Sequence, residues 1–474
     1  MRLRAAYVRG MGQGANLGIG DLVGGVLRGR VMPERVVRLG VTGLSRAGKT
    51  VFITNLVANL LARGRMPALS ARDRIEAVYL HPQPDMTLPR FAYEEHLAAM
   101  TGDYQHWPQS TRAVSELRLS FRVRGRGLLG VLGPQVVHLD IVDYPGEWLL
   151  DLGLLDKSYQ DWSEAVLARL SKRDEGAGYL ALARAEDGAL PLDEPRAAAL
   201  ARAFTAYLQT ARQAGLSDCT PGRFLLPGDL AGAPALTFAP LPKPASLPKG
   251  CQWSAMQARF EAYKAQIIRP FFRDHFAKID RQIVLVDVMA AVHRGPTALE
   301  DLRRTLAEVL GAFLPGKRGW LDRIMGTKRV ERILFAATKA DHLHHHQHPN
   351  LTALTEALLD EAKARADFAG AKTAALSLAS LRCTVEDEIP RDGALLDGVR
   401  GRLADGRRIA LYPGELPSDP ARLLAPAREG ATRWLNADFA LMAFEPARFA
   451  ARAGAGPPHI RLDRAAEFLF GDLL

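Results

Sequence analysis

The chain has 474 residues, of which 48 % are apolar and 24 % charged, and its formal net charge is +10. This length supports roughly two or three domains with a large core. The composition is typical of a globular protein and excludes a disordered or fibrous chain. No run approaches about 18 consecutive apolar residues, so we expect no membrane-spanning helix.

The basic excess is concentrated near the N-terminus. Residues 1–38 carry seven arginines against Asp21 and Glu34, a net charge of +5. A basic leader over 1–35 can contact anionic lipid or nucleic acid, or can be a solvated or packed helix. No specific nucleic-acid motif accompanies it. The three scattered cysteines and the lack of a signal-peptide-like apolar core predict a cytoplasmic protein. The leader leaves peripheral contact at the inner membrane open as one alternative.

The first motif is a glycine-rich loop between a strand and a helix. The apolar run 36–42 predicts a strand, 51–61 predicts a helix, and Gly43–Thr50 between them fits G-x-x-x-x-G-K-[ST]. Such a loop points backbone N–H groups at phosphates, next to the positive end of a helix. Lys49 is expected to reach the β- and γ-phosphates, and Thr50 to offer its hydroxyl to Mg²⁺.

A second strand-end motif follows. Residues 62–110 are interrupted by prolines and predict a long connection with a short helix at Tyr93–Thr101. Alternating runs at 115–123 and 135–143 predict an antiparallel hairpin. The second run ends in Asp143-Tyr144-Pro145-Gly146, a D-x-x-G. An aspartate there can hold the Mg²⁺ shell opposite Thr50, and the Gly146 N–H can meet the γ-phosphate.

Residues 155–279 predict an inserted helical module. Helical spacing of apolar residues is present in Leu154–Leu170, Pro195–Gln213 and Trp253–Phe276. Between them, 220–250 is rich in proline, which fits either an ordered loop or a mobile linker.

The third motif follows a strand at Arg332–Ala337. Thr338-Lys339-Ala340-Asp341 fits [NT]-K-x-D, in which the aspartate accepts from N1–H and N2–H₂ of guanine together and the lysine stem lies along the base and sugar. Thr338 is shorter than the commoner asparagine. A helix at 351–367 and a strand at 373–378 follow, and their exit at Ser380 and Leu381 is expected to bring a backbone N–H to the guanine O6.

The rest of the chain offers less chemistry. Residues 384–474 predict one strand at 408–412 and a last helix at 463–470. The run His342, His344, His345, His346 and His348 invites a metal assignment, but no cysteine or carboxylate at suitable spacing completes a zinc site. We expect it to be a solvent-facing turn.

With these motifs, the chain resembles the YcjX-like family of bacterial P-loop GTP-binding proteins. The likeness covers nearly the whole chain and is carried by four stretches: Thr42–Thr50, Trp107–Thr111, Asp143–Trp148 and Ala337–His342. The resemblance implies a G-domain core, GTP or GDP, Mg²⁺, and a stress-linked role that is often associated with the phage-shock or envelope-stress response.

The resemblance also implies a set of site residues. Thr111 would be the first-switch threonine that joins Mg²⁺ and the γ-phosphate, although it could also cap a turn. Asp143 and Gly146 would form the second switch. Nucleotide contacts are expected from Gly43, Ser45, Arg46, Ala47, Gly48, Lys49, Thr50, Val51, Thr338, Lys339, Asp341, Ser380 and Leu381, and metal contacts from Thr50, Thr111 and Asp143.

For hydrolysis, positioning and charge stabilisation matter most. Glu147 stands where many relatives carry a water-positioning glutamine, and a carboxylate cannot donate a hydrogen bond, so we expect slow turnover. Arg46 and Arg112 are candidates to stabilise transition-state charge from within the chain, or simply face solvent.

The expected fold class is α/β: a P-loop G-domain-like, mostly parallel sheet with flanking helices and a large inserted helical module. The expected domains are the leader 1–35, a discontinuous G domain over 36–154 and 280–390, the insertion 155–279, and a C-terminal extension over 391–474. We favour a slow GTPase switch whose protein partner binds the insertion. An ATP-using P-loop NTPase and a non-catalytic, nucleotide-stabilised scaffold at a membrane surface are the alternatives.

Overall fold

The computed structural model describes residues 34–44, 46–102, 104–109, 113–125, 133–312, 330–368, 371–391, 393–435, 438–448 and 454–474, with only the backbone described for 310–312 and 361–368. The basic leader lies almost entirely outside the described residues.

A seven-stranded sheet in the order β2-β3-β4-β1-β5-β6-β7 forms the centre of the molecule. Strands β4, β1, β5, β6 and β7 run parallel, and β2 and β3 are added in antiparallel pairing. Their bounds are β1 Arg35–Gly43, β2 Ile75–His81, β3 Ser115–Val123, β4 Gln135–Asp143, β5 Arg281–Val286, β6 Arg332–Ala337 and β7 Lys372–Ser377. The α/β class with a mostly parallel sheet and the predicted hairpin are confirmed.

The edge strand β2 was not predicted, since its stretch was assigned to a long connection. It pairs with β3 through Val78 and Phe121 and has a register shift near its start. An edge strand buries only part of its surface, so its apolar alternation is weak in sequence.

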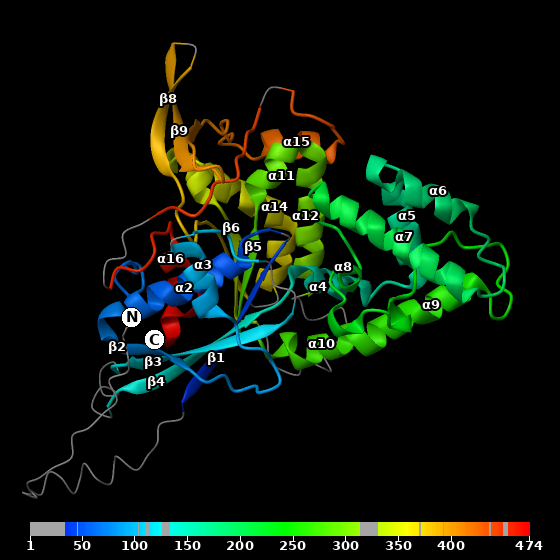
Figure 1. Ribbon diagram of the computed structural model, residues 1–474, viewed down its shortest axis with the longest axis horizontal. Helices are drawn as coiled ribbons and strands as arrows, with labels where there is room; N and C mark the ends of the chain where they lie inside the picture. The colour runs from blue at the N-terminus through cyan, green and yellow to red at the C-terminus, as the bar shows by residue number, and fades with distance from the viewer. Residues whose placement is uncertain are drawn as a thin grey trace, which may run out of the picture.

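Helices cover both faces of the sheet (Figure 1). On one face α2 (Lys49–Ala62), α3 (Tyr93–Thr101) and α16 (Leu462–Phe470) lie together, and α2 and α16 share a core with the inward side chains of β1. On the other face α12 (Pro296–Ala312) and α14 (His348–Phe368) pack on Val284 and Phe335, and α11 (Val288–Arg294) joins β5 to α12. The sheet is therefore buried on both faces, as its continuous apolar strands require.

The helices between β4 and β5 extend away from the sheet (Figure 1). They are α4 (Gly146–Leu150), α5 (Tyr159–Leu170), α6 (Ala177–Ala185), α7 (Glu194–Gln213), α8 (Gly222–Leu225), α9 (Gln252–Tyr263) and α10 (Arg269–Asp274). Their core is aromatic: the ring of Trp162 contacts Phe204, Phe238 and Phe260. The proline-rich stretch joins this core, since Tyr159 and Tyr179 donate to the carbonyls of Ala239 and Pro240.

Local signals set the helix ends. Helix α5 begins later than its apolar spacing suggested, because Ser158 accepts from the Asp161 N–H as an N-cap. Asp193 caps α7 in the same way, followed by Pro195 in the first turn. The single helix predicted over Trp253–Phe276 is interrupted by a π turn at Lys264–Ile268.

After β7 the chain forms a second, three-stranded sheet, where only one strand was predicted. Strands β8 (Val385–Arg391), β9 (Ala394–Arg402) and β10 (Arg408–Leu411) pair antiparallel and project from the body of the molecule (Figure 1). Helix α15 (Ala421–Arg428) follows and packs on α12. Strand β8 is charged and contains Pro390, which hides it from a periodicity search. Among the described helices, none combines the length and the apolar character that crossing a membrane requires.

Candidate functional site

The glycine-rich loop lies at the carboxyl edge of the sheet, between β1 and α2. Arg46 and Gly48 have positive φ angles of 61° and 83°, and the Ala47 N–H donates to the Leu44 carbonyl over 3.0 Å. Lys49 is the first residue of α2, and its Cγ would lie 3.1 Å from a Cβ added at Gly43. The loop thus curls tightly and ends at a helix N-terminus, as phosphate binding requires.

The D-x-x-G segment packs directly on this loop. Asp143 is buried and pairs in register with Val41 of β1. A Cβ added at Gly146 would lie 1.9 Å from the Gly43 carbonyl oxygen, so only glycine permits this approach. The parallel pairing of β1 and β4 thus brings the two motifs together.

The structure pairs Glu147 with a residue of the helical region. Its carboxylate is 2.7 Å from the guanidinium of Arg212 in α7, and the Glu147 side chain is only 8 % exposed. The sequence did not predict this contact, because 65 residues of chain separate the partners.

The [NT]-K-x-D segment follows β6, two strands along from β1. Lys339 is in the left-handed region, and its ammonium is 2.5 Å from the carboxylate of Asp287 at the end of β5. Asp287 also caps α11 by accepting from the Ala290 N–H. The Thr338 N–H donates to the Val286 carbonyl over 2.9 Å, and its hydroxyl donates to the same oxygen over 3.4 Å. Asp287 was missed, although it too ends an apolar strand.

Asp341 is 4 % exposed and orders the next loop. Its Oδ2 accepts from the Cys383 N–H over 2.7 Å, and its carbonyl accepts from the Thr384 hydroxyl. Ser380 and Leu381 lie in the loop that this contact holds, and the adjoining Ala379 bridges to Ile460. The Asp341 carboxylate and the loop expected to reach the guanine O6 are therefore adjacent.

The glycine-rich loop, the [NT]-K-x-D segment and the 379–381 loop share one cavity of about 380 Å³, whereas Asp143 and Gly146 are not among the described residues that line it. Its lining unites residues 46–51 of the glycine-rich loop and α2, Thr338, Lys339 and Asp341, and the 379–381 loop. Segments not predicted to contribute also line it: Trp107, Pro108, His342, Cys383, Met442, Ala443 and Phe444. The Trp107 indole donates to the Phe444 carbonyl over 2.9 Å, joining two of these segments. Residues 384–474 therefore contribute to the lining of the cavity, although the sequence predicted no site chemistry there.

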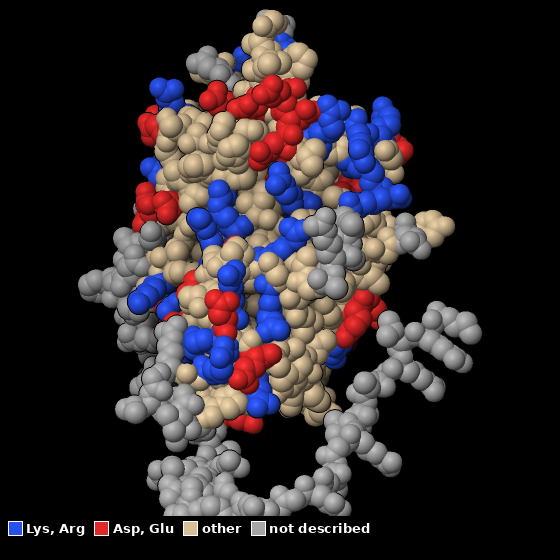
Figure 2. Space-filling model, turned by 90° about the vertical axis from the view of Figure 1, so that its left-hand side faces the viewer, with Lys and Arg blue, Asp and Glu red and all other residues tan. Residues whose placement is uncertain are grey.

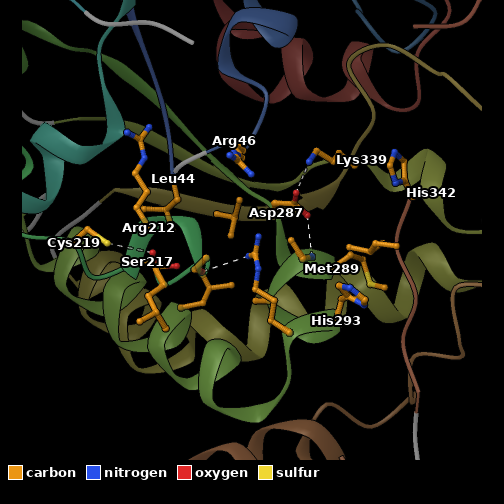
Figure 3. A pocket seen from close by; sticks show the side chains of 18 of the residues that line it. Leu44, Arg46, Arg212, Ser217, Cys219, Asp287, Met289, His293, Lys339 and His342 are labelled. Atoms are coloured by element: carbon orange, nitrogen blue, oxygen red, sulfur yellow. Dashed lines mark hydrogen bonds and ion pairs between the residues drawn. The ribbon is translucent and has the colours of Figure 1, made fainter. Parts of the chain in front are cut away.

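A second cavity of about 370 Å³ adjoins the first, with Arg46 and Lys339 common to both. Figure 3 labels Arg212 and Leu44 at one end, His293 and Met289 at the other, and draws Lys339 bonded to Asp287. Glu147 also lines it. Arg46, an exposed residue of the glycine-rich loop, therefore lines both cavities.

Some predicted site residues lie outside the described part of the chain. Ser45, Thr111 and Arg112 are among them, so their roles stay predictions. For magnesium, the buried Thr50 hydroxyl and Asp143 carboxylate are the oxygen ligands that this ion prefers, and both are at the same sheet edge. The donor set therefore fits Mg²⁺.

Comparison with known proteins shows which family the chain belongs to. The model of the YcjX-like family, DUF463, matches residues 37–474. The chain is 40 % identical over 459 residues to the "Ras-like GTPase YcjX" of Escherichia coli K12, covering 93 % of this chain and 96 % of that protein. It is 33 % identical over 477 residues to the protein of the same name from Shewanella oneidensis MR-1, covering 93 % and 95 %. The chain belongs to the YcjX-like family.

Proposed function

We propose that this protein binds guanine nucleotides with Mg²⁺, hydrolyses GTP slowly to GDP and phosphate, and acts as a nucleotide-dependent switch. One observation carries the proposal: the glycine-rich loop, the [NT]-K-x-D segment and the 379–381 loop line a single cavity of about 380 Å³. The names of the two relatives support the same nucleotide class.

Asp341 would select guanine. A carboxylate offers about four acceptor positions, so it can keep the Cys383 N–H bond and also accept from N1–H and N2–H₂ of the base. Adenine has no such donor pair on that edge. The ATP-using alternative is disfavoured for this reason.

Competition against labelled GDP tests the nucleotide. We expect unlabelled GDP and GTP to displace it and ATP to fail. In Asp341→Asn the amide oxygen can still accept from Cys383, which turns the amide N–H₂ toward the base. We therefore expect GDP to bind at least about 100-fold more weakly and xanthosine diphosphate, which carries a carbonyl at C2, to bind better. Equal competition by ATP, or unchanged GDP binding in the variant, would contradict the proposal.

Slow hydrolysis is supported by the surroundings of Glu147. Its carboxylate is held by Arg212 and cannot donate to an attacking water. In P-loop GTPases an amide side chain commonly orients that water. We propose that the ion pair between Glu147 and Arg212 limits the intrinsic rate. Lys49, Thr111, Gly146 and Arg46 are the other proposed participants.

Single-turnover GTP hydrolysis tests this role. Glu147→Gln weakens the ion pair and supplies an amide, so we expect the rate to rise about tenfold, equivalent to ~1.4 kcal/mol of barrier. Glu95→Gln, an exposed position of the same type in α3, should leave the rate unchanged. Equal rates for wild type and Glu147→Gln would remove Glu147 from the mechanism.

The output of the switch is proposed to be partner binding at the helical region. Leu190 and Leu192 are 46 % and 37 % exposed there, on a segment that bonds to Gly250 and Gln252. On the face shown in Figure 2, positive and negative side chains are interspersed rather than gathered into one basic surface. Membrane contact is proposed for the basic leader, which liposome flotation with and without residues 1–35 tests. A role in bacterial stress rests on family resemblance, and a deletion phenotype under envelope stress tests it.

A further inference from the structure

Three consecutive histidines bring their rings together just beyond the base-reading segment. One ring nitrogen from each of His344, His345 and His346 lies within 4.8 Å of the others. Their ring centroids are 4.1–4.6 Å apart. His345 and His346 are 56 % and 65 % exposed, as expected of a solvent-facing turn, but His344 is 12 % exposed.

Two carboxylates from the small sheet face these rings. The Nδ1 atoms of His345 and His346 are each 3.0 Å from one carboxylate, that of Glu386 and that of Asp397 respectively. His344 approaches both carboxylates at 3.7 Å. Because Glu386 pairs with Val399, two residues beyond Asp397, both acids lie on the same face of the sheet.

The largely buried His344 has a ring nitrogen that is available to bind a ligand. Nδ1 of His344 is buried and makes no hydrogen bond within the described residues. A buried polar atom of this kind calls for an unseen partner such as an ion or water.

The geometry points to a divalent transition-metal site formed by His344, His345 and His346, with the facing carboxylate of Asp397 as the fourth ligand, Glu386 beside them, and zinc as the best fit. Two donors bound to one tetrahedral zinc at ~2.0–2.1 Å lie about 3.3 Å apart. The Nδ1 atoms of His346 and His344 lie 3.0 and 3.7 Å from the same Asp397 carboxylate oxygen, and these two separations bracket this value. Imidazole nitrogen suits zinc, copper, nickel and cobalt, whereas Mg²⁺ and Ca²⁺ prefer all-oxygen shells.

The bound metal would tie the small sheet to the turn that leads from Asp341 into α14. Without it, the link consists of partly exposed pairs between histidines and carboxylates, which contribute little to stability. A metal that binds the folded state and not the unfolded state raises the melting temperature. The site thus acts as a structural clip, independent of the nucleotide chemistry.

Zinc binding to the full chain tests the inference, using protein treated with EDTA, free of any added histidine tag and of nucleotide. We expect one equivalent of Zn²⁺ to bind at micromolar or lower concentration, with a rise in melting temperature. Co²⁺ in place of zinc should give intense visible absorption bands typical of tetrahedral coordination.

Variants identify the ligands. His345→Ala with His346→Ala should abolish stoichiometric binding, and Glu386→Gln with Asp397→Asn should weaken it at least tenfold. His106→Ala, an exposed histidine elsewhere, should bind as wild type does. If wild type takes up no stoichiometric zinc, the contacts are ion pairs only. If the carboxylate variant binds as tightly as wild type, the histidine run binds alone. Either result overturns the proposed site.

Discussion

At the residue scale, Gly146 is the tightest point of contact between two motifs of the site. Its α-carbon faces the backbone of Gly43, the first glycine of the phosphate loop, with no room for a methyl group. The same residue begins α4 and, under the proposed function, offers its N–H to the γ-phosphate. Its role is therefore one of spacing as much as of hydrogen bonding.

Gly146→Ala is expected to push α4 away from the phosphate loop, since the new methyl would meet backbone rather than a flexible side chain. We expect a loss of about 1–3 kcal/mol in the free energy of unfolding and at least about tenfold weaker GTP binding. Chemical denaturation and nucleotide titration measure the two effects.

Gly178→Ala is the matched control. Gly178 is exposed in α6, and an added Cβ there meets nothing within 4 Å. Alanine should therefore stabilise the protein by up to about 1 kcal/mol and leave nucleotide affinity unchanged. Unchanged GTP affinity in Gly146→Ala would show that the close approach is not needed for binding.

At the element scale, one buried acid helps to join the end of α4 to helices α8 and α9. Asp151 accepts from the Tyr263 hydroxyl over 2.5 Å and from the Gly222 N–H over 2.7 Å, joining the end of α4 to α9 and α8. Burial raises the pKa of Asp151 from 3.8 to about 6, although these hydrogen bonds oppose the shift.

The raised pKa predicts the sign of a pH effect on stability. Because the folded-state pKa exceeds the unfolded one, the contribution of this carboxyl is fully present below about pH 4 and is lost as pH rises through about 6. The loss is about 3 kcal/mol by the usual conversion.

Asp151→Asn should remove that component. Urea unfolding measures the free energy of unfolding at about pH 4 and about pH 7.5. Its decrease between the two pH values should be about 3 kcal/mol larger in wild type than in the variant. Asp174→Asn, an exposed aspartate of the same region, should behave as wild type. A variant whose pH dependence matches wild type would mean that Asp151 does not keep its proton in the folded state.

At the scale of the whole molecule, the nucleotide cavity is assembled from distant parts of the chain. Trp107 precedes β3, while Met442 and Phe444 follow the small sheet, and all three line the same cavity. Phe444 packs on β9, where a Cβ added at Gly401 would meet its ring at 2.3 Å. The C-terminal part thus contributes directly to the site.

Apolar packing joins the parts of the chain that were predicted to be separate domains. One apolar core joins the helical region to a face of the sheet, through residues such as Trp148, Phe271 and Val286. The last helix packs on the opposite face, and its Asp463 and Glu467 accept from the backbone of Ala68 and Ser70. The division of these parts into separate domains stays a prediction.

The sequence alone was enough to predict the parallel sheet and the three nucleotide-binding motifs, because each motif is a short contiguous stretch at the end of an apolar strand. Parallel strands place their carboxyl ends at one edge, so Gly43, Asp143 and Thr338 meet there without further information. Edge strand β2 and the charged strand β8 were not predicted from the sequence, since neither shows clear apolar alternation.

Only the tertiary structure decided the long-range pairs: Glu147 with Arg212, Lys339 with Asp287, and the three histidines with Glu386 and Asp397. Such contacts join side chains from separate elements, and their spacing along the chain carries no periodic signal. The local sequence fixes which strand ends carry the chemistry, whereas packing of distant elements decides what holds each side chain in place.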